Sequence, residues 1–143
     1  MTASHLAPRT GSEAMTLFLP QSPFVQHLGI ELVEIEEGRA RLRMPFREEL
    51  VTVGAMVHGG ALAACIDIGI VAAAWAGERL PEQLRGVTVS MSIDFVQSAN
   101  GESVDIIGTR LRAGRQLTTC RVDIVTTGDE RLVAAGGGTY KMG

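Results

Sequence analysis

The chain has 143 residues, of which 45% are hydrophobic and 20% are charged. This length is typical of one globular domain and is too short for two ordinary ones. The formal net charge is −3, from 13 basic and 16 acidic residues that are spread along the chain. Because nucleic acid and membrane surfaces attract concentrated positive charge, we expect neither a nucleic-acid partner nor a membrane partner.

Cysteine and histidine residues are few and far apart. Cys65 and Cys120 fit buried free thiols, although a single disulfide between them is also open. His5, His27 and His58 form no ligand cluster with cysteine or carboxylate residues, so we expect no metal. The longest apolar stretch is shorter than a membrane span and contains an aspartate, and we expect a cytoplasmic protein.

The first part of the chain shows no periodic pattern. Residues 1–20 are predicted to form a flexible tail because they mix small and polar residues with proline and glycine. Residues 21–143 are then one domain. Within it, Ser22–Gly29 opens with serine and proline and ends with glycine, which are the start and stop signals of a short helix.

Two strands are predicted next, over Ile30–Ile35 and Arg39–Met44. In the second strand, three arginines alternate strictly with apolar residues. This period of two predicts a half-buried antiparallel sheet with the arginines on its solvent-exposed face. The following stretch, Pro45–Val57, is expected to be a long loop.

An apolar segment, Ala61–Ala76, occupies the centre of the sequence. It is apolar on all sides, which is typical of a helix that a sheet wraps. Its only ionisable side chains are Cys65 and Asp67. A carboxyl group is costly to bury unless it is paired. Asp67 is therefore either a carboxyl that is hydrogen-bonded inside the core or a functional group, such as a general base or a nucleophile.

The rest of the chain has the pattern of strands. In Gly86–Phe95 apolar residues alternate with threonine, serine and aspartate. The next three strands are expected to form an antiparallel meander because glycine-containing turns join them; they are Ser103–Arg112, Gln116–Thr126 and Arg131–Lys141. With two strands before the one long helix, this order predicts an α+β domain whose antiparallel sheet is wrapped around the central helix.

The residues His58, Gly59 and Gly60 lead into the apolar segment. Two glycines at a helix start leave the first backbone N–H groups open, and the helix dipole adds partial positive charge there. They form a candidate oxyanion hole, although glycines also occur at helix starts for close packing. Gly59 and Asp67 are eight residues apart, or roughly 12 Å along one helix. Both act on one substrate only if they come from different subunits of a symmetric dimer.

Two sequence motifs resemble those of a known family. The stretch HGGALAACID and the strand GVTVSMSIDF are similar to the hotdog-fold acyl-CoA thioesterases of the PaaI-like (phenylacetate-degradation) group. The resemblance covers about Phe24–Tyr140. It implies a hotdog fold and hydrolysis of an acyl-CoA thioester to a free acid and CoA, with no cofactor because coenzyme A is part of the substrate. A non-catalytic hotdog domain that binds acyl-CoA is the alternative.

The resemblance also implies roles for individual residues. The Gly59 N–H would bind the thioester carbonyl, and His58 would support this loop. Asp67 of the opposite subunit would act as general base or nucleophile. Thr88 takes the place of a serine or threonine that hydrogen-bonds the water or the carboxylate.

For substrate and CoA binding, the resemblance implies a tunnel between the subunits of a homodimer, which is expected to pair into a dimer of dimers. The candidate residues are Thr52, Met56, Gly60, Arg85, Ser90 and Arg115. The two arginines are the candidates for the CoA phosphates, and Met56 for the acyl pocket. Thr52 stands where the family commonly has asparagine or glutamine, so that role is weakened, taken by another group or absent.

Overall fold

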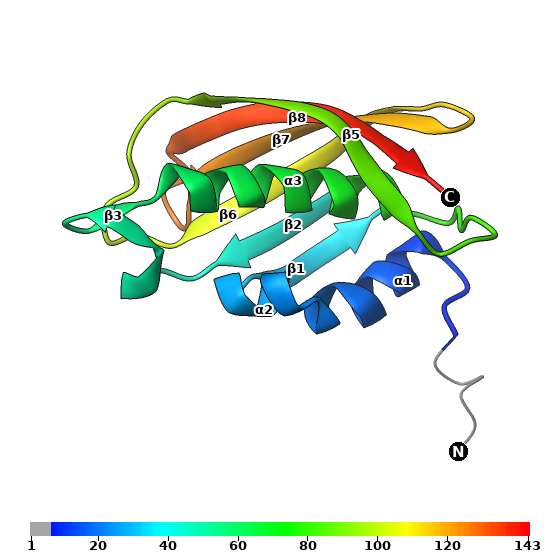
Figure 1. Cartoon of the computed structure of the whole chain (residues 1–143), viewed down its shortest axis with the longest axis horizontal. Helices are drawn as coiled ribbons and strands as arrows, with labels where there is room; N and C mark the ends of the chain where they lie inside the picture. Colours follow the sequence, from blue (N-terminus) through cyan, green and yellow to red (C-terminus); the bar gives the residue numbers. More distant parts are fainter. Residues whose placement is uncertain (1–6) are drawn as a thin grey trace, which may run out of the picture.

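The computed structural model describes residues 7–143, and an antiparallel sheet curls around one long helix in this part of the chain (Figure 1). The helix is α3, Gly59–Trp75. The six strands of the sheet lie in the order β1-β2-β6-β7-β8-β5. Their bounds are β1 Glu31–Glu36, β2 Arg39–Met44, β5 Gly86–Phe95, β6 Val104–Ala113, β7 Leu117–Thr126 and β8 Leu132–Met142. This arrangement confirms the predicted α+β architecture.

The hydrophobic core lies between α3 and the inner face of the sheet. Ile66 and Ile70 of α3 are fully buried. The helix also comes very close to β6, where a Cβ atom added to Gly108 would lie 2.5 Å from the carbonyl oxygen of Gly69. Only glycine permits this approach of the two backbones. The small residues of α3 therefore set how deeply the helix sits against the sheet.

One face of α3 is not covered by the sheet. Ala64, Asp67 and Val71 follow one another at helical spacing and are only half-buried. The sheet therefore wraps this apolar helix on one side, whereas the sequence pattern predicted cover all round. Asp67 lies on the open side, which explains how an apolar helix accommodates a carboxyl group.

The prediction of a flexible tail over residues 1–20 is wrong for its second half. Helix α1, Gly11–Phe18, lies within that range, and the short 3₁₀ helix η2, Leu19–Gln21, begins within it. The Thr10 hydroxyl accepts a hydrogen bond from the Glu13 N–H at 3.1 Å and so caps α1. Residues 1–6 lie outside the described part of the chain. Helix α2, Pro23–Leu28, follows where a short helix was expected.

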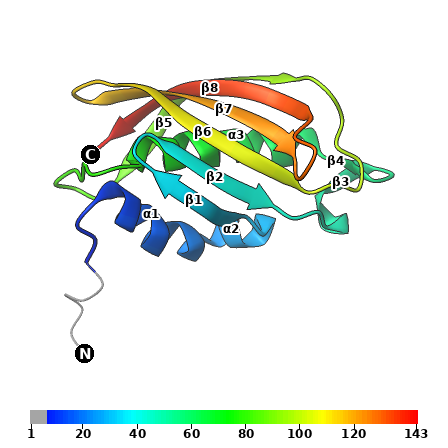
Figure 2. The same cartoon turned by 180° about the vertical axis from the view of Figure 1, so that it is seen from behind.

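Tertiary contacts hold α1 in place. Ala14 and Met15 are buried, and Ser12 forms two hydrogen bonds with Gly77 just after α3, at 3.0 and 2.8 Å. Figure 2 shows α1 and α2 along the β1 edge of the sheet. A stretch of eight residues with mixed composition is too short to show a helical pattern of apolar residues. Such a short helix is stabilised mainly by tertiary packing and less by the helix propensity of its residues.

The predicted loop Pro45–Val57 contains three short elements. They are the 3₁₀ helix η3, Glu48–Leu50, and the strands β3, Val51–Val53, and β4, Met56–Val57. Gly54 turns the chain between the two strands with a positive φ of 58°. Strands of two and three residues are too short to show a period of two, so the sequence pattern did not predict this hairpin.

The outer face of β2 is more than a solvated surface. Asp105 of β6 is only 2% exposed. It accepts hydrogen bonds from Arg41 at 2.6 Å, from Arg43 at 2.7 Å and from Thr127 at 2.7 Å. Burial raises the pKa of Asp105, but the hydrogen bonds from Arg43, Thr127 and Arg41 outweigh it and lower the pKa to about 2. Two of the three alternating arginines are therefore partners of a buried carboxylate.

Both cysteines are free and buried, which removes the disulfide alternative. Burial raises the pKa of Cys65 to about 12 and that of Cys120 to about 11. Within residues 7–143, no group of three or more His, Cys, Asp or Glu side chains is placed to hold a metal ion. None of the helices described is long and apolar enough to cross a membrane.

Candidate active site

The start of α3 presents one open amide. His58 is the N-cap of the helix, and its Nδ1 accepts a hydrogen bond from the Gly60 N–H at 2.7 Å. The Gly60 N–H is therefore occupied, which corrects the expectation that both glycines are available to a substrate. The Gly59 N–H has no hydrogen-bond partner within residues 7–143 and remains free.

A pocket of about 330 Å³ opens beside this amide. Its lining residues are mainly apolar and come from the β3–β4 hairpin, the first turn of α3 and the end of β5; they are Thr52, Met56, Val57, Gly59, Leu62, Phe95, Val96, Gln97 and Ser98. The structure thus brings the predicted residues Thr52, Met56 and Gly59 together. Such a pocket suits a compact apolar ligand with one polar group at the Gly59 amide.

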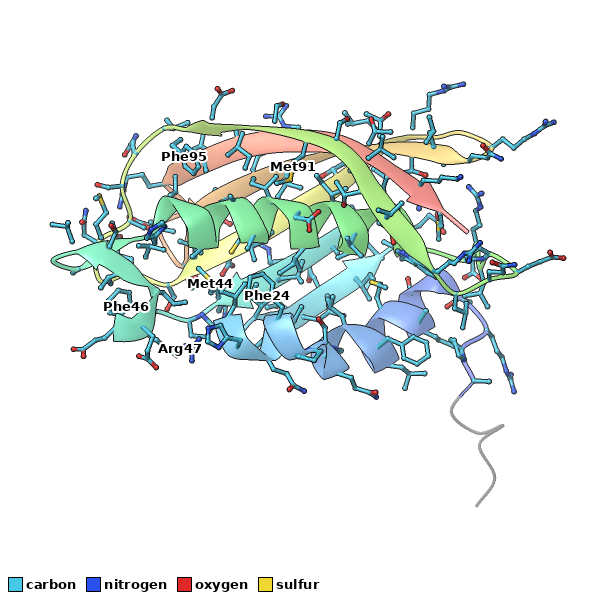
Figure 3. All side chains as sticks on the ribbon, viewed as in Figure 1. Phe24, Met44, Phe46, Arg47, Met91 and Phe95 are labelled. Carbon is cyan, nitrogen blue, oxygen red and sulfur yellow. The ribbon has the colours of Figure 1, made fainter. Side chains whose placement is uncertain are left out.

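Phe95 was not among the predicted site residues, but its ring forms a wall of this pocket. A Cβ atom added to Gly59 would lie 3.6 Å from Cε1 of Phe95. Figure 3 shows Phe95 and Met91 on β5, above α3. The alternation of apolar residues along Gly86–Phe95 was the signal that could have placed Phe95 on the helix side of the sheet.

Asp67 forms the second functional cluster, with Thr88 of β5. The Thr88 hydroxyl donates a hydrogen bond to Asp67 Oδ1 at 2.6 Å. No other hydrogen bond reaches this carboxylate from the described residues, so its second oxygen is free to act. Asp67 is therefore hydrogen-bonded yet half-open to solvent, which fits a functional carboxylate better than a core carboxyl.

A bulge in β5 makes this contact. The pairing of β5 with β8 shifts by one residue between Thr88 and Ser90. A shift of one residue moves the side chains that follow to the other face of the sheet. Thr88 pairs with the buried Tyr140, and Met91 pairs with Gly138, which faces Ile70 of α3. Thr88 therefore shares the helix face with Met91, although the sequence alternation predicted opposite faces.

The same bulge separates Ser90 from the catalytic candidates. Ser90 pairs with Thr139 and lines a broad depression of about 680 Å³ together with Arg121 and Leu111. This depression lies on the outer face of the sheet, away from α3. The structure therefore does not bring Ser90 to Asp67 or Thr88.

The two arginines predicted for CoA phosphates lie apart from both clusters. Arg85 lines a small pocket of about 250 Å³ with Lys141, at the beginning of β5. Arg115 lies in the turn between β6 and β7, where its carbonyl oxygen accepts a hydrogen bond from Arg79 at 3.0 Å. Within one protomer, neither arginine contacts the Gly59 pocket or Asp67.

The far end of α3 is fixed by a pair of aromatic residues that the motifs did not indicate. Trp75 Nε1 donates a hydrogen bond to the Tyr140 hydroxyl at 2.9 Å, and both side chains are buried. Burial raises the pKa of Tyr140. The hydrogen bond from Trp75 lowers this pKa in part, and the nearby charge of Asp67 raises it further. Since Tyr140 is the cross-strand neighbour of Thr88, this pair helps to hold the Asp67 region in position.

The distance between the two clusters decides what one protomer can do. Gly59 and Asp67 belong to a single uninterrupted helix, so eight residues separate them by roughly 12 Å along its axis. One carbonyl group cannot contact both. A protomer thus carries an amide donor with its pocket at one place and a carboxylate at another.

Comparison with known proteins gives concordant matches. Residues 46–139 match the family model for the acyl-CoA thioesterase N-terminal domain. The chain is 27% identical over 142 residues to the medium/long-chain acyl-CoA thioesterase YigI of Escherichia coli K12, with 89% of this chain and 90% of YigI covered.

Solved structures agree on the fold. Zebra fish thioesterase superfamily member 2 has a TM-score of 0.78 and 27% identity, covering 94% of this chain and 99% of that one. The E. coli PaaI protein from the phenylacetic acid degradation operon has a TM-score of 0.79 and 20% identity, covering 99% and 96%. These similarities confirm the predicted hotdog fold and the PaaI-like resemblance.

Proposed function

This chain belongs to the acyl-CoA thioesterase family and is a thioester hydrolase, and we propose that it cleaves an acyl-CoA to a free acid and CoA at a site shared by two protomers. One observation carries the proposal. The open Gly59 amide and the half-open carboxylate of Asp67 are chemically complementary, but they lie roughly 12 Å apart on one helix. A second copy of the chain is needed to unite them.

The edge of the sheet indicates how the two copies meet. β5 is an edge strand of ten residues, and four of its apolar side chains are exposed: Val87, Val89, Met91 and Phe95. A long apolar edge strand is a template for pairing with another strand. Antiparallel pairing of two β5 strands about a two-fold axis runs the two α3 helices in opposite directions. Asp67 of one protomer then faces the Gly59 pocket of the other.

In this dimer the Gly59 N–H donates to the thioester carbonyl oxygen. Asp67 of the partner subunit takes a proton from water as the water oxygen attacks the carbonyl carbon. The negative charge that develops on the carbonyl oxygen is stabilised by the Gly59 N–H and the helix dipole. The intermediate then expels the CoA thiolate by breaking the C–S bond, and the thiolate takes up a proton.

The same geometry serves the nucleophilic route. Asp67 then attacks the carbonyl carbon itself, CoA leaves, and water cleaves the mixed anhydride. In both routes Thr88 holds Oδ1 and leaves Oδ2 to react, and His58 fixes the turn that carries Gly59. Neither route requires a metal or an added cofactor.

The remaining parts of the substrate are assigned by chemistry. The pocket beside Gly59, with Met56 and Thr52 in its lining, receives the acyl group, because its walls are mainly apolar. Arg85 and Arg115 are assigned to the CoA phosphates, because both are exposed and a guanidinium group pairs well with phosphate. We expect the dimers to pair further into a dimer of dimers.

Thiol release from a panel of short-chain, long-chain and aromatic acyl-CoAs tests the proposal. Asp67→Asn keeps the shape of the side chain and its hydrogen bond but removes the base, so kcat should fall on the order of 1,000-fold while the dimer persists. Asp123→Asn is the matched control, because Asp123 lies on β7 in a weak surface pair with Arg121. Turnover by Asp67→Asn at the rate of this control would contradict the proposal.

A further inference from the structure

Gln97 is an exposed residue that lines the Gly59 pocket, and the mechanism above gives its side-chain amide no role. Gln97 lines this pocket together with Phe95 and Gly59. It follows Phe95 by two residues at the end of β5, and its backbone N–H donates to the Val133 carbonyl at 3.1 Å. The backbone bond fixes the point from which the side chain extends.

Arg131 determines which way the Gln97 carboxamide faces. Arg131 Nη1 donates to Gln97 Oε1 at 3.1 Å and to the Ser98 carbonyl at 3.1 Å, and Nη2 donates to Glu102 Oε1 at 2.7 Å. A guanidinium group has only donors, so the Gln97 atom that it contacts is the oxygen. Nε2 therefore carries two N–H groups, and neither has a partner among residues 7–143.

A thioester carbonyl bound at Gly59 needs such a donor. A carbonyl oxygen has two acceptor positions, and the Gly59 N–H fills one of them. The neighbouring Gly60 N–H is bound to His58 Nδ1. The other side-chain donors of the pocket are the hydroxyls of Thr52 and Ser98. The Ser98 hydroxyl accepts from Asn100 at 2.9 Å, which holds its oxygen and leaves its O–H able to donate.

Gln97 is the best fixed of these donors. Its carboxamide is tethered through Arg131 to the carboxylate of Glu102, whereas the Thr52 hydroxyl has no hydrogen bond within the described residues. A donor that is held before the reaction stabilises developing charge without reorganising. Building on the function proposed above, we propose that Gln97 Nε2 is the second hydrogen-bond donor to the thioester carbonyl and that Arg131 is its positioning residue.

Kinetics of two Gln97 variants provide the first test. Gln97→Glu keeps the shape and the contact with Arg131 but presents an oxygen to the carbonyl, and Gln97→Leu removes the amide. For both we expect kcat to fall on the order of 100-fold with KM within about threefold, as for loss of an oxyanion donor. Gln21→Glu adds the same charge at an exposed position of η2 and should leave both constants unchanged.

Arg131→Leu tests the tether separately. It leaves Gln97 in place but frees its carboxamide, so kcat should fall about tenfold. Combined with Gln97→Leu, it should add no further loss, because both changes act through one hydrogen bond. If the loss of kcat in the double variant equals the product of the losses in the two single variants, the positioning role of Arg131 is overturned.

Infrared spectroscopy of bound substrate gives a readout other than turnover. An acyl-CoA labelled with ¹³C at the carbonyl is bound to the Asp67→Asn variant, which should not hydrolyse it during the measurement. Hydrogen bonding lowers the carbonyl stretching frequency, and adding Gln97→Leu should move the band toward that of the free thioester. An unchanged band, or unchanged kcat in both Gln97 variants, would overturn this inference.

The two proposals fail in different ways. If the wild-type chain releases no CoA from any acyl-CoA tested, the proposed function fails. If the wild type is active, Asp67→Asn is inactive and the Gln97 variants match the wild type, only the role of Gln97 fails.

Discussion

Thr88 reaches Asp67 because of one irregular residue position in β5. Without the shift between Thr88 and Ser90, the threonine would face the outer side of the sheet with Ser90. A bulge beside a functional side chain commonly re-aims it. The sequence could not reveal this bulge, because the alternation from Val87 to Phe95 is as regular as in an uninterrupted strand. The role of Thr88 came from the family resemblance, and the bulge supplies its physical cause.

Thr88→Val keeps the shape of the side chain and removes the hydroxyl donor. We expect kcat to fall about tenfold or more, with little change in KM, because Asp67 Oδ1 loses the bond that orients the carboxylate. Steady-state kinetics of thioester cleavage measure this effect. Thr88→Ser restores a hydroxyl and should recover most of the rate. Wild-type kcat in Thr88→Val would remove Thr88 from the site.

At the scale of elements, periodicity predicted what is long and regular. The sequence indicated the six main strands, α2 and the central helix, whose observed bounds differ by a few residues. It missed α1 and the β3–β4 hairpin, which tertiary contacts and a glycine turn stabilise. It also assigned the arginines of β2 to solvent, because nothing local in the sequence shows that Asp105 lies opposite Arg43.

The candidate site was predictable to a similar degree. The motif around His58 and Asp67 identified the open amide and the carboxylate, and the rise of an α-helix was enough to predict their separation. Phe95 and Gln97 were missed because the sequence does not show that the end of β5 returns to the start of α3. Such contacts depend on the way the sheet curls around the helix.

The ion-pair cluster of Asp105 predicts an acid-sensitive sheet. Its pKa of about 2 in the folded chain is below the ordinary value of 3.8. The carboxylate therefore contributes stability above about pH 4, and this contribution is lost as the pH falls toward 2. Asp105→Asn should lower the free energy of unfolding near pH 7 by on the order of 2 kcal/mol.

Urea unfolding of the wild type and Asp105→Asn, followed at about pH 7, 4 and 2.5, checks this prediction. The difference in unfolding free energy between the wild type and Asp105→Asn should become smaller as the pH falls from about 4 to about 2.5. Asp123→Asn serves as the control, because its weak surface pair should contribute little at any pH. A difference that stays constant with pH would show that Asp105 does not titrate as described.

For the whole molecule, the proposed function makes one protomer half of an enzyme. Its exposed edge strand, the uncovered face of α3 and the separation of Gly59 from Asp67 are all accounted for by the proposed partner, a second copy in the opposite direction. In the proposed dimer, each active site therefore takes its amide from one protomer and its carboxylate from the other.

Complementation between two inactive variants tests whether the two protomers share each active site. Gly59→Pro removes the amide, because proline has no N–H yet is favoured at the first helical position. His58 already has the extended backbone, with φ −62° and ψ 134°, that a following proline requires. Asp67→Asn removes the carboxylate, so each variant alone should be inactive.

The two variants are co-expressed with different tags, and the mixed dimer is purified through both tags. One of its two sites then combines an intact Gly59 with an intact Asp67, so the mixed dimer should show about half of the wild-type turnover. A mixed dimer as inactive as its parents would contradict the shared site.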